Sequence, residues 1–211
     1  SGAIASKNVG NSKSVTLGSI ALADGTGAAS NYNLTSAEMN VSKRVLSSSG
    51  SRQYDGTTNA SNSNMTLSNL IGSETLVFSG TGTLANANVA SNKSVTLNSL
   101  SIADGSNGGL AANYTLSGGT HQLTVNKKNL SVLSSRQYDG TQKIEGSSMT
   151  LSGVVSGESL NVSGDIITNS GNVGTYSTSS SNLSCSDINS CSSGQFKVTS
   201  RAGSGGTNWP G

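Results

Sequence analysis

A long internal repeat constrains the fold of this chain more than any other feature. The heptad SRQYDGT occurs at 51–57 and again at 135–141, and the pentapeptide KSVTL occurs at 13–17 and 93–97. The distance in sequence between the two copies is 80 residues for KSVTL and 84 for SRQYDGT. It grows only between such matched segments, where glycine-rich stretches accommodate the insertions. A long, nearly constant period predicts a series of similar structural units.

The landmarks divide the chain into three parts. Residues 1–42 match the second half of a module, residues 43–128 are a whole module, and residues 129–211 are a third module that diverges after residue 175. We call residues 43–128 the middle module. About 84 residues are enough for a separate core, which favours independent units over the short coils of a β-solenoid.

An asparagine followed by an aromatic residue marks the second half of each module. Tyr32 and Tyr114 occupy this place in the first two parts, and we predict that Trp209 occupies it in the third. On this alignment the chain begins halfway through a module and stops just after Trp209. We therefore expect an unpaired strand edge at each end, which is a template for adding a strand from another chain.

Apolar and polar residues alternate within short segments of the chain. Val95 and Leu97, or Met149 and Leu151, are typical, and Gly, Ser, Asn and Asp separate such segments. The alternation predicts antiparallel strands with one buried face, and no sustained 3.6-residue period indicates a long helix. We expect an all-β fold of tandem, elongated modules, either β-grasp-like or a small β-sandwich, with little helix.

The repeated heptad contains residue types that are common in turns and in ligand sites. If residues 51–54 are extended, Arg52 and Tyr54 share one face, and Asp55-Gly56 follows as a turn pair. The second copy places the same residue types at Arg136, Tyr138, Asp139 and Gly140. We interpret the heptad as an entry turn whose tyrosine is anchored on a core with few aromatic residues. An exposed tyrosine and arginine platform for sugars is the alternative.

The order of these landmarks resembles that of the YDG domain, a module related to the MBG domains. RQYDGT is followed by MTLSNLIGSETLVFSG, NANVASNKSVTL, IADG and NYTL, which covers the middle module from end to end. The resemblance implies an all-β or β-grasp-like module that occurs in tandem in large exported bacterial surface proteins, many of them filamentous-haemagglutinin-like adhesins. It implies no catalytic residues, and the sequence departs from its pattern at 175–207.

Cys185 and Cys191 are the only cysteines, so a single intramolecular pairing is available. Five residues rich in Ser, Asp and Asn separate them, and an exported protein meets oxidising conditions. We therefore predict a disulfide. A metal site is a poorer interpretation because the single histidine, His121, is distant in sequence, and the spacing is not that of a Cys-x-x-Cys redox pair.

The remaining polar residues give little sign of catalysis. His121 has no nucleophile or orienting group in its neighbourhood, so we expect an exposed histidine at a strand end. The 10 acidic residues are dispersed, and GTGTL at 80–84 lacks the lysine of a phosphate-binding loop. Lys13 and Lys93 recur at equivalent places, either as solvated strand residues or as partners in a covalent link to asparagine. We expect no enzyme and no cofactor.

Charge and hydropathy exclude two classes of partner. The 12 basic residues are dispersed and the net charge is only +2, so no stripe neutralises a row of phosphates and we expect no nucleic acid. No run of 18 apolar residues is present, so we expect no membrane insertion. We expect a stalk or fibre segment on the outside of a bacterial cell, whose partners are neighbouring modules or identical subunits. The alternatives are a head-to-tail filament completed by strand exchange and a module that binds host, matrix or mucin glycans.

Overall fold

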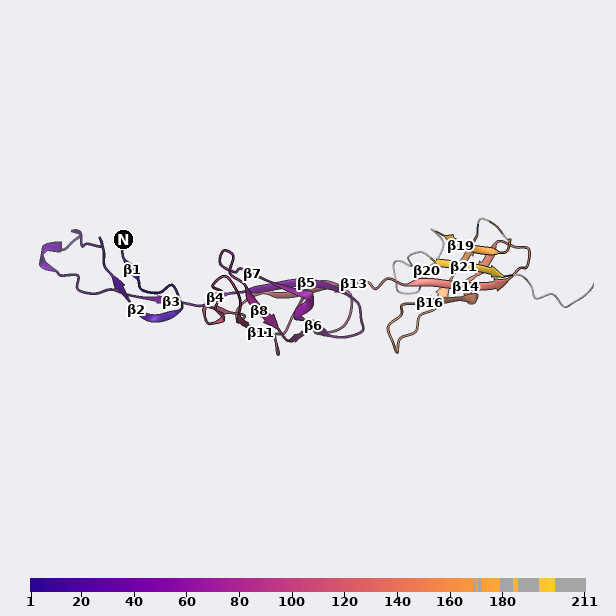
Figure 1. Ribbon diagram of the computed structural model, residues 1–211, viewed down its shortest axis with the longest axis horizontal. Coiled ribbons are helices and arrows are strands. Elements are labelled where there is room, and N and C mark those ends of the chain that lie inside the picture. Colours follow the sequence, from indigo (N-terminus) through magenta and orange to yellow (C-terminus); the bar gives the residue numbers. More distant parts are fainter. Residues whose placement is uncertain (169, 171, 179–183, 186–193, 200–211) are drawn as a thin grey trace, which may run out of the picture. The chain divides into compact units, whose positions relative to one another are not determined.

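The computed structural model describes residues 1–168, 170, 172–178, 184–185 and 194–199 (Figure 1). In this part of the chain the regular elements are β-strands, and each helical element is a short 3₁₀ turn. Most strand pairs are antiparallel. The expected all-β class is confirmed. The chain forms two compact units. The first unit consists of Ser1–Arg52 and Thr57–Asn126, and the second unit consists of Gln53–Gly56 and Lys127–Gly211.

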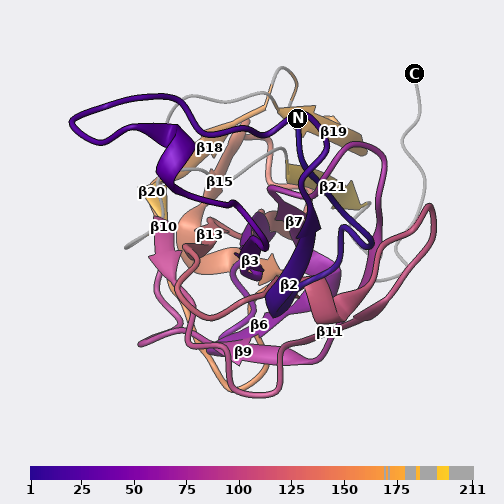
Figure 2. The ribbon, with the colours of Figure 1, turned by 90° about the vertical axis from the view of Figure 1, so that its left-hand side faces the viewer.

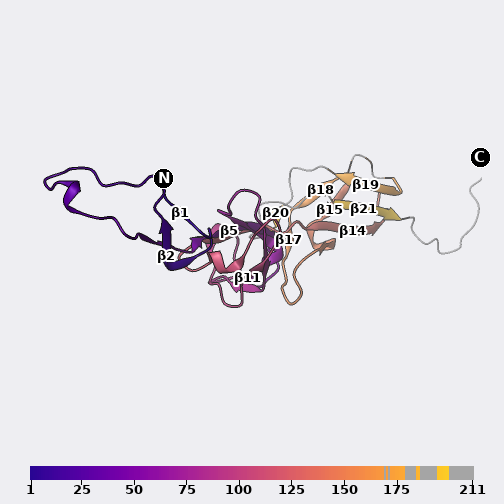
Figure 3. The same ribbon diagram turned by 60° about the vertical axis from the view of Figure 1, so that its left-hand side comes forward.

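Residues 1–42 form a three-stranded antiparallel sheet with the order β1-β2-β3. Its strands are β1 (Ala3–Ile4), β2 (Gly10–Thr16) and β3 (Glu38–Val41). β2 and β3 lie side by side (Figure 2). The connection between them contains the turn η1 (Ala29–Asn31) and extends away from the sheet (Figure 3).

The middle module contains a four-stranded sheet with the order β10-β13-β5-β7. Its elements are β4 (Arg44–Val45), β5 (Ser47–Gln53), β6 (Asn59–Ser61), η2 (Asn62–Asn64), β7 (Met65–Ser68), β8 (Leu76–Ser79), β9 (Thr81–Thr83), β10 (Ala90–Ser94), β11 (Ser101–Asp104), η3 (Ala111–Asn113), β12 (Tyr114–Thr115) and β13 (His121–Asn126). β6 pairs with β9 and β8 with β11, both antiparallel, whereas β4 and β12 are parallel. Sequence alternation could not reveal this direction, because a parallel pair needs a long crossover and here the crossover is most of the module.

Alternation along each strand builds the core of the middle module. In β13, His121, Leu123 and Val125 are buried, while Gln122 and Thr124 between them are half-buried, as a period of two requires. The buried apolar side chains of this module come from strands and connections alike: Leu46, Ala60, Met65, Leu84, Val95, Leu100, Tyr114, Leu116, Leu123 and Val125.

The β2–β3 pair and the β10–β13 pair have the same register and the same irregularity. Lys13 lies opposite Met39 as Lys93 lies opposite Leu123. In each pair the register shifts just before the lysine, at a residue with positive φ: Ser12 (46°) and Asn92 (51°). A β-bulge of this kind fixes the pairing and bends the strand, so the second half of the module has folded in the same way twice.

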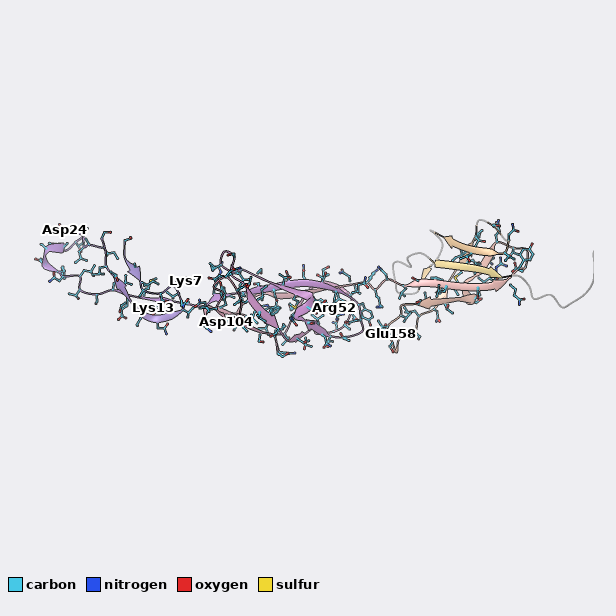
Figure 4. All side chains as sticks on the ribbon, viewed as in Figure 1. Lys7, Lys13, Asp24, Arg52, Asp104 and Glu158 are labelled. Carbon is cyan, nitrogen blue, oxygen red and sulfur yellow. The ribbon has the colours of Figure 1, made fainter. Side chains whose placement is uncertain are left out.

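The lysine after each bulge is tied to its own loop. Lys13 Nζ donates to the carbonyl oxygen of Asn8 at 2.6 Å, and Lys93 Nζ donates to that of Asn88 at 2.6 Å. Both lysines are half-buried; Figure 4 labels Lys13 beside β2. Their equivalent positions therefore reflect a repeated loop closure, and neither lysine is simply solvated.

The second unit repeats the strand order of the middle module. Its elements are β14 (Ser131–Gln137), β15 (Lys143–Glu145), η4 (Gly146–Ser148), β16 (Met149–Ser152), β17 (Val162–Ser163), β18 (Asp165–Ile167), β19 (Gly174–Thr178), β20 (Ser184–Cys185) and β21 (Gly194–Thr199). The sheet order β16-β14-β21-β19 matches β7-β5-β13-β10, and the pairs β15–β18 and β17–β20 match β6–β9 and β8–β11. Val132, Ile144, Met149 and Ile166 form its core cluster.

β21 takes the place in the second unit that β13 has in the middle module. β21 lies between β14 and β19 as β13 lies between β5 and β10, and Tyr114 precedes β13 in the chain. Trp209 follows β21 in the sequence, and its correspondence with Tyr114 stays a prediction. β21 is an interior strand of its sheet, and the unpaired edge expected at the end of the chain stays a prediction. Trp209 itself lies outside the described residues.

Candidate functional site

A cleft of about 290 Å³ lies in the first unit, where residues 1–42 approach the middle module. Its polar lining comes from the β1–β2 connection, β4, the β7–β8 connection, η3 and β12. The residues that determine its chemistry are Lys7, Val9, Arg44, Glu74, Asn113 and Tyr114. We call Lys7, Asn8, Val9, Glu74, Asn113 and Tyr114 the joint; Figure 4 labels Lys7 at this place.

Glu74 is the acceptor at the centre of the joint. The turn that holds it closes with a hydrogen bond from its own N–H to the carbonyl oxygen of Ile71 at 2.9 Å. Its Oε2 accepts from the Tyr114 hydroxyl at 2.5 Å, and its Oε1 accepts from Lys7 Nζ at 2.9 Å. The side chain of Glu74 is 10% exposed. Two partners from different parts of the chain thus share one nearly buried carboxylate.

The protonation states of the joint follow from these contacts. The hydrogen bond from Tyr114, followed by that from Lys7, lowers the pKa of Glu74 although burial opposes the shift. Burial and the bond to Glu74 raise the pKa of Tyr114, and the carboxylate raises the pKa of Lys7. At neutral pH the carboxylate is therefore ionised, the phenol is neutral and the amine is charged. The arrangement holds the groups together and offers no acid or base poised near pH 7.

Asn113 completes the joint with its side-chain amide. Its Oδ1 accepts from the backbone N–H of Val9 at 2.9 Å, and its Nδ2 donates to Asn8 Oδ1 at 3.0 Å. The orientation of the amide is fixed because a backbone N–H can only donate. These bonds connect segments that are far apart in sequence. The second half of one repeat is thereby attached to the next.

The arginine anchors the turn of each SRQYDGT heptad. Arg52 is buried, and its Nη2 donates to the carbonyl oxygen of Thr57 at 2.6 Å, which closes the turn. Arg136 donates in the same way to Thr141 and also binds Asp139. In contrast, Tyr138 is 46% exposed and Tyr54 is half-buried. The structure therefore gives the role of anchor, which we had assigned to the tyrosine, to the arginine.

The Asp-Gly pair forms the turn that was expected from its chemistry. Asp139 Oδ1 accepts from both the backbone N–H and the hydroxyl of Thr141, each at 2.9 Å. These bonds, first that of the backbone N–H, lower the pKa of Asp139. Gly140 and Gly56 have φ values of 78° and 77°, a region that favours glycine. Asp55, in the first copy of the heptad, is exposed.

His121 is buried, so the expectation of an exposed histidine is wrong. Its Nε2 lies 2.9 Å from the carbonyl oxygen of Leu116, and its Nδ1 lies 2.8 Å from the hydroxyl of Ser48. A carbonyl only accepts, so Nε2 donates to Leu116, and the Ser48 hydroxyl is the hydrogen-bond partner of Nδ1. The second unit has buried Val132 at the position of Ser48. His121 and Ser48 are therefore hydrogen-bond partners in the core of the middle module, and Val132 cannot make this bond in the second unit.

The other predicted residues are distributed as follows. Tyr114 is buried within the joint, whereas its counterpart Tyr32 is 68% exposed. Cys185 belongs to β20, but Cys191 lies outside the described residues, so the disulfide stays a prediction. Within the part of the chain that the structure describes, no three His, Cys, Asp or Glu side chains are placed to hold a metal ion. In the same residues no helix has the length and hydropathy to cross a membrane.

Sequence reasoning did not single out the joint. Glu74 recurs as Glu158 one repeat later, and this repetition of a rare charge in a chain with only 10% charged residues was an available signal. Asn113 belongs to the asparagine–aromatic landmark, but only the aromatic residue of that landmark was predicted to be a structural anchor. Nothing in the sequence pairs Lys7 with Glu74, because the contact depends on how two repeats meet.

Comparison with known proteins adds one finding about the middle of the chain. The family model of the YDG domain matches residues 38–124, which run from β3 to β13. No curated protein matches the chain. No solved structure matches it. Residues 38–124 therefore form a YDG domain.

Proposed function

We propose that this chain is a region of tandem YDG modules in an extracellular bacterial surface protein, where it acts as a segment of an adhesive stalk or fibre. The YDG domain at residues 38–124 and the matching strand order of the second unit support the tandem arrangement. The resemblance to exported surface proteins supports the location. The proposal includes no catalytic role and no cofactor, and its partners are neighbouring modules, with surface glycans as a further candidate.

One observation carries the mechanical part of this proposal. β14 opens the module in the second unit, β21 is the last strand described there, and the two are parallel neighbours. Their register runs from Leu133 opposite Gln195 to Gln137 opposite Thr199. When two paired parallel strands are pulled from the start of one and the end of the other, their hydrogen bonds are sheared together. Antiparallel strands pulled from adjacent ends open one bond at a time. A module built in this way resists tension along the chain.

The joint supports the same proposal between repeats. A fibre needs each repeat to be attached to the next by more than a flexible linker, because Gly- and Ser-rich segments are otherwise flexible coils. In the first unit, Glu74 and Asn113 bind Lys7, Asn8 and Val9 of the preceding repeat. These contacts restrict how the two parts can move relative to each other.

Single-molecule force spectroscopy tests the proposal directly. Pulling the chain from its two ends should give discrete rupture events, one for each module that unfolds. About 84 residues extend by up to about 3.6 Å each, so each event should release about 300 Å of chain less the end-to-end distance of the folded module. A matched control pulls from attachment points at Ser131 and Ser152, which lie opposite each other in β14 and β16. That geometry unzips the pair and should need a clearly lower force. Equal forces in both geometries would contradict the mechanical role.

The location is tested separately on intact cells. Antibodies raised against the folded chain should label the surface of a bacterium that produces the parent protein, and external protease should remove the label. Labelling that appears only after the cells are permeabilised would overturn the extracellular assignment. Alkylation of the purified chain before and after reduction would show by mass whether Cys185 and Cys191 are joined, as expected outside the cell.

A further inference from the structure

We propose that residues 1–42 present an acceptor face that binds the first half of a further YDG module. This rests on the proposed tandem arrangement and names a partner for it. We define the acceptor face by four exposed apolar side chains: Ile20, Tyr32, Leu34 and Met39. By the first half of a module we mean the segment equivalent to residues 43–80, which includes β5 and β7.

The counterparts of these four side chains are buried in the middle module. Met39 is 45% exposed, whereas Leu123, at the same register position, is 0% exposed. Tyr32 is 68% exposed, whereas Tyr114 is 2% exposed. The same contrast holds for Ile20 against Leu100 and for Leu34 against Leu116. The acceptor face therefore has the composition of a module core without the cover that buries it.

The backbone shows which element provides that cover. β13 lies between β10 and β5, whereas its counterpart β3 is an edge strand with β2 as its described neighbour. In the middle module, the N–H of Ser48 donates to the carbonyl oxygen of Thr120 at 3.0 Å. The sequence equivalent of Thr120 is Ser36, just before β3. A segment like β5 would add a strand at this edge and pair with it.

The β2–β3 hairpin at the acceptor face already has the register of its counterpart in the middle module. Ala3 lies opposite Thr16 in the β1–β2 pair, as Thr83 lies opposite Thr96 in the middle module. The bulge in β2 and its lysine also match those in β10. Binding would therefore require little rearrangement of the β1–β2–β3 sheet, which lowers the cost of association, and the connection that carries Ile20, Tyr32 and Leu34 would fold onto the added strands.

The occupant is the first half of a further repeat, and a second copy of this chain does not fit as well. The two first halves present here are already used, because Leu46 of the middle module and Val132 of the second unit are 0% and 1% exposed. Donating either of them to another chain would expose its own core. A first half that is not yet paired has no such cost.

An extended chain tests the proposal. Ser1 occupies the position that Thr81 has in the middle module, so a copy of residues 43–80 joined directly to Ser1 recreates a whole module. Hydrogen exchange followed by mass spectrometry should show the amides of residues 33–41 exchanging at least about tenfold more slowly in the extended chain, because an interior strand opens less often than an edge strand. The amides of 121–126 should be unchanged. The matched control carries Leu46→Asp in the added copy and should lose the protection.

Two results would overturn the inference. Exchange at 33–41 that is the same with and without the added copy would show that the face does not accept a first half. Strong protection of 33–41 in the original chain, together with a dimer in light scattering, would show that a second copy covers the face instead. Neither result concerns the rupture of the middle module under force, so failure here is distinguishable from failure of the proposed function.

Discussion

Replacing Leu123 by alanine is expected to destabilise the first unit far more than replacing Met39, although the two residues occupy the same position in repeated hairpins. Leu123 is 0% exposed and Met39 is 45% exposed. Leu→Ala removes three carbon groups, worth about 2.4 kcal/mol at about 0.8 kcal/mol each. The cavity that remains raises the expected loss in the free energy of unfolding to about 3–5 kcal/mol. For Met39→Ala we expect about 1 kcal/mol or less, because solvent already covers much of the side chain.

Native-state hydrogen exchange in the full chain measures both losses in the same unit. The slowest amides of 121–126 report the opening of the first unit. They should exchange at least about a hundredfold faster in Leu123→Ala, since each 1.4 kcal/mol is a factor of ten. Met39→Ala should change their rates by less than about tenfold. A similar increase in exchange rate in the two variants would refute this prediction. It would mean that the first half of the module does not bury Leu123 more effectively than solvent-exposed Met39 is buried.

Three further predictions concern single residues, each measured as a shift in the urea unfolding midpoint. The folded pKa of Glu74 is lowered from its ordinary value of 4.5, so the stability that its carboxylate contributes is present above pH 4.5 and is lost as the pH falls through the folded pKa. Glu74→Gln should therefore flatten the acid side of the plot of unfolding free energy against pH. An unchanged plot would count against the joint. Arg136→Ala should cost about 1.5–3 kcal/mol because it removes charged hydrogen bonds, whereas Tyr138→Ala, a change on the same turn, should cost about 0.5 kcal/mol or less; the reverse order would restore the tyrosine as the anchor. Gly140 has free space around it but a φ of 78°, so Gly140→Ala should cost about 1–2 kcal/mol, whereas Gly25→Ala, also in open space but without positive φ, should be close to neutral.

The strands and their repetition were predictable because they depend on local patterns. Val95 and Leu97 alternate with polar residues, and KSVTL recurs with its surroundings, so equal sequences gave equal strands. The Asp-Gly turn was predictable for the same reason, since Asp139 bonds to a residue two positions away. Short-range chemistry of this kind is largely independent of the rest of the fold.

The features that sequence reasoning missed all depend on contacts across long sequence separations. His121 is buried because Ser48, which is distant in the chain, lies beside it in the folded module. Lys7 and Glu74 meet only because two repeats are joined there. The place of β21 depends on a long-range contact too, since only its pairing with β14 shows where this strand of the third module lies.

The Ser48–His121 hydrogen bond has a consequence for how such a chain reaches its native state. Neighbouring repeats with nearly the same sequence can misfold by exchanging equivalent segments, a known failure of repeat proteins. If β14 took the place of β5, Val132 would face His121, and the buried imidazole would lose one hydrogen-bond partner, at a cost of about 1–3 kcal/mol. The Ser48–His121 pair thus favours the correct assembly of two similar modules. It penalises an exchange of equivalent strands that the apolar core alone would tolerate.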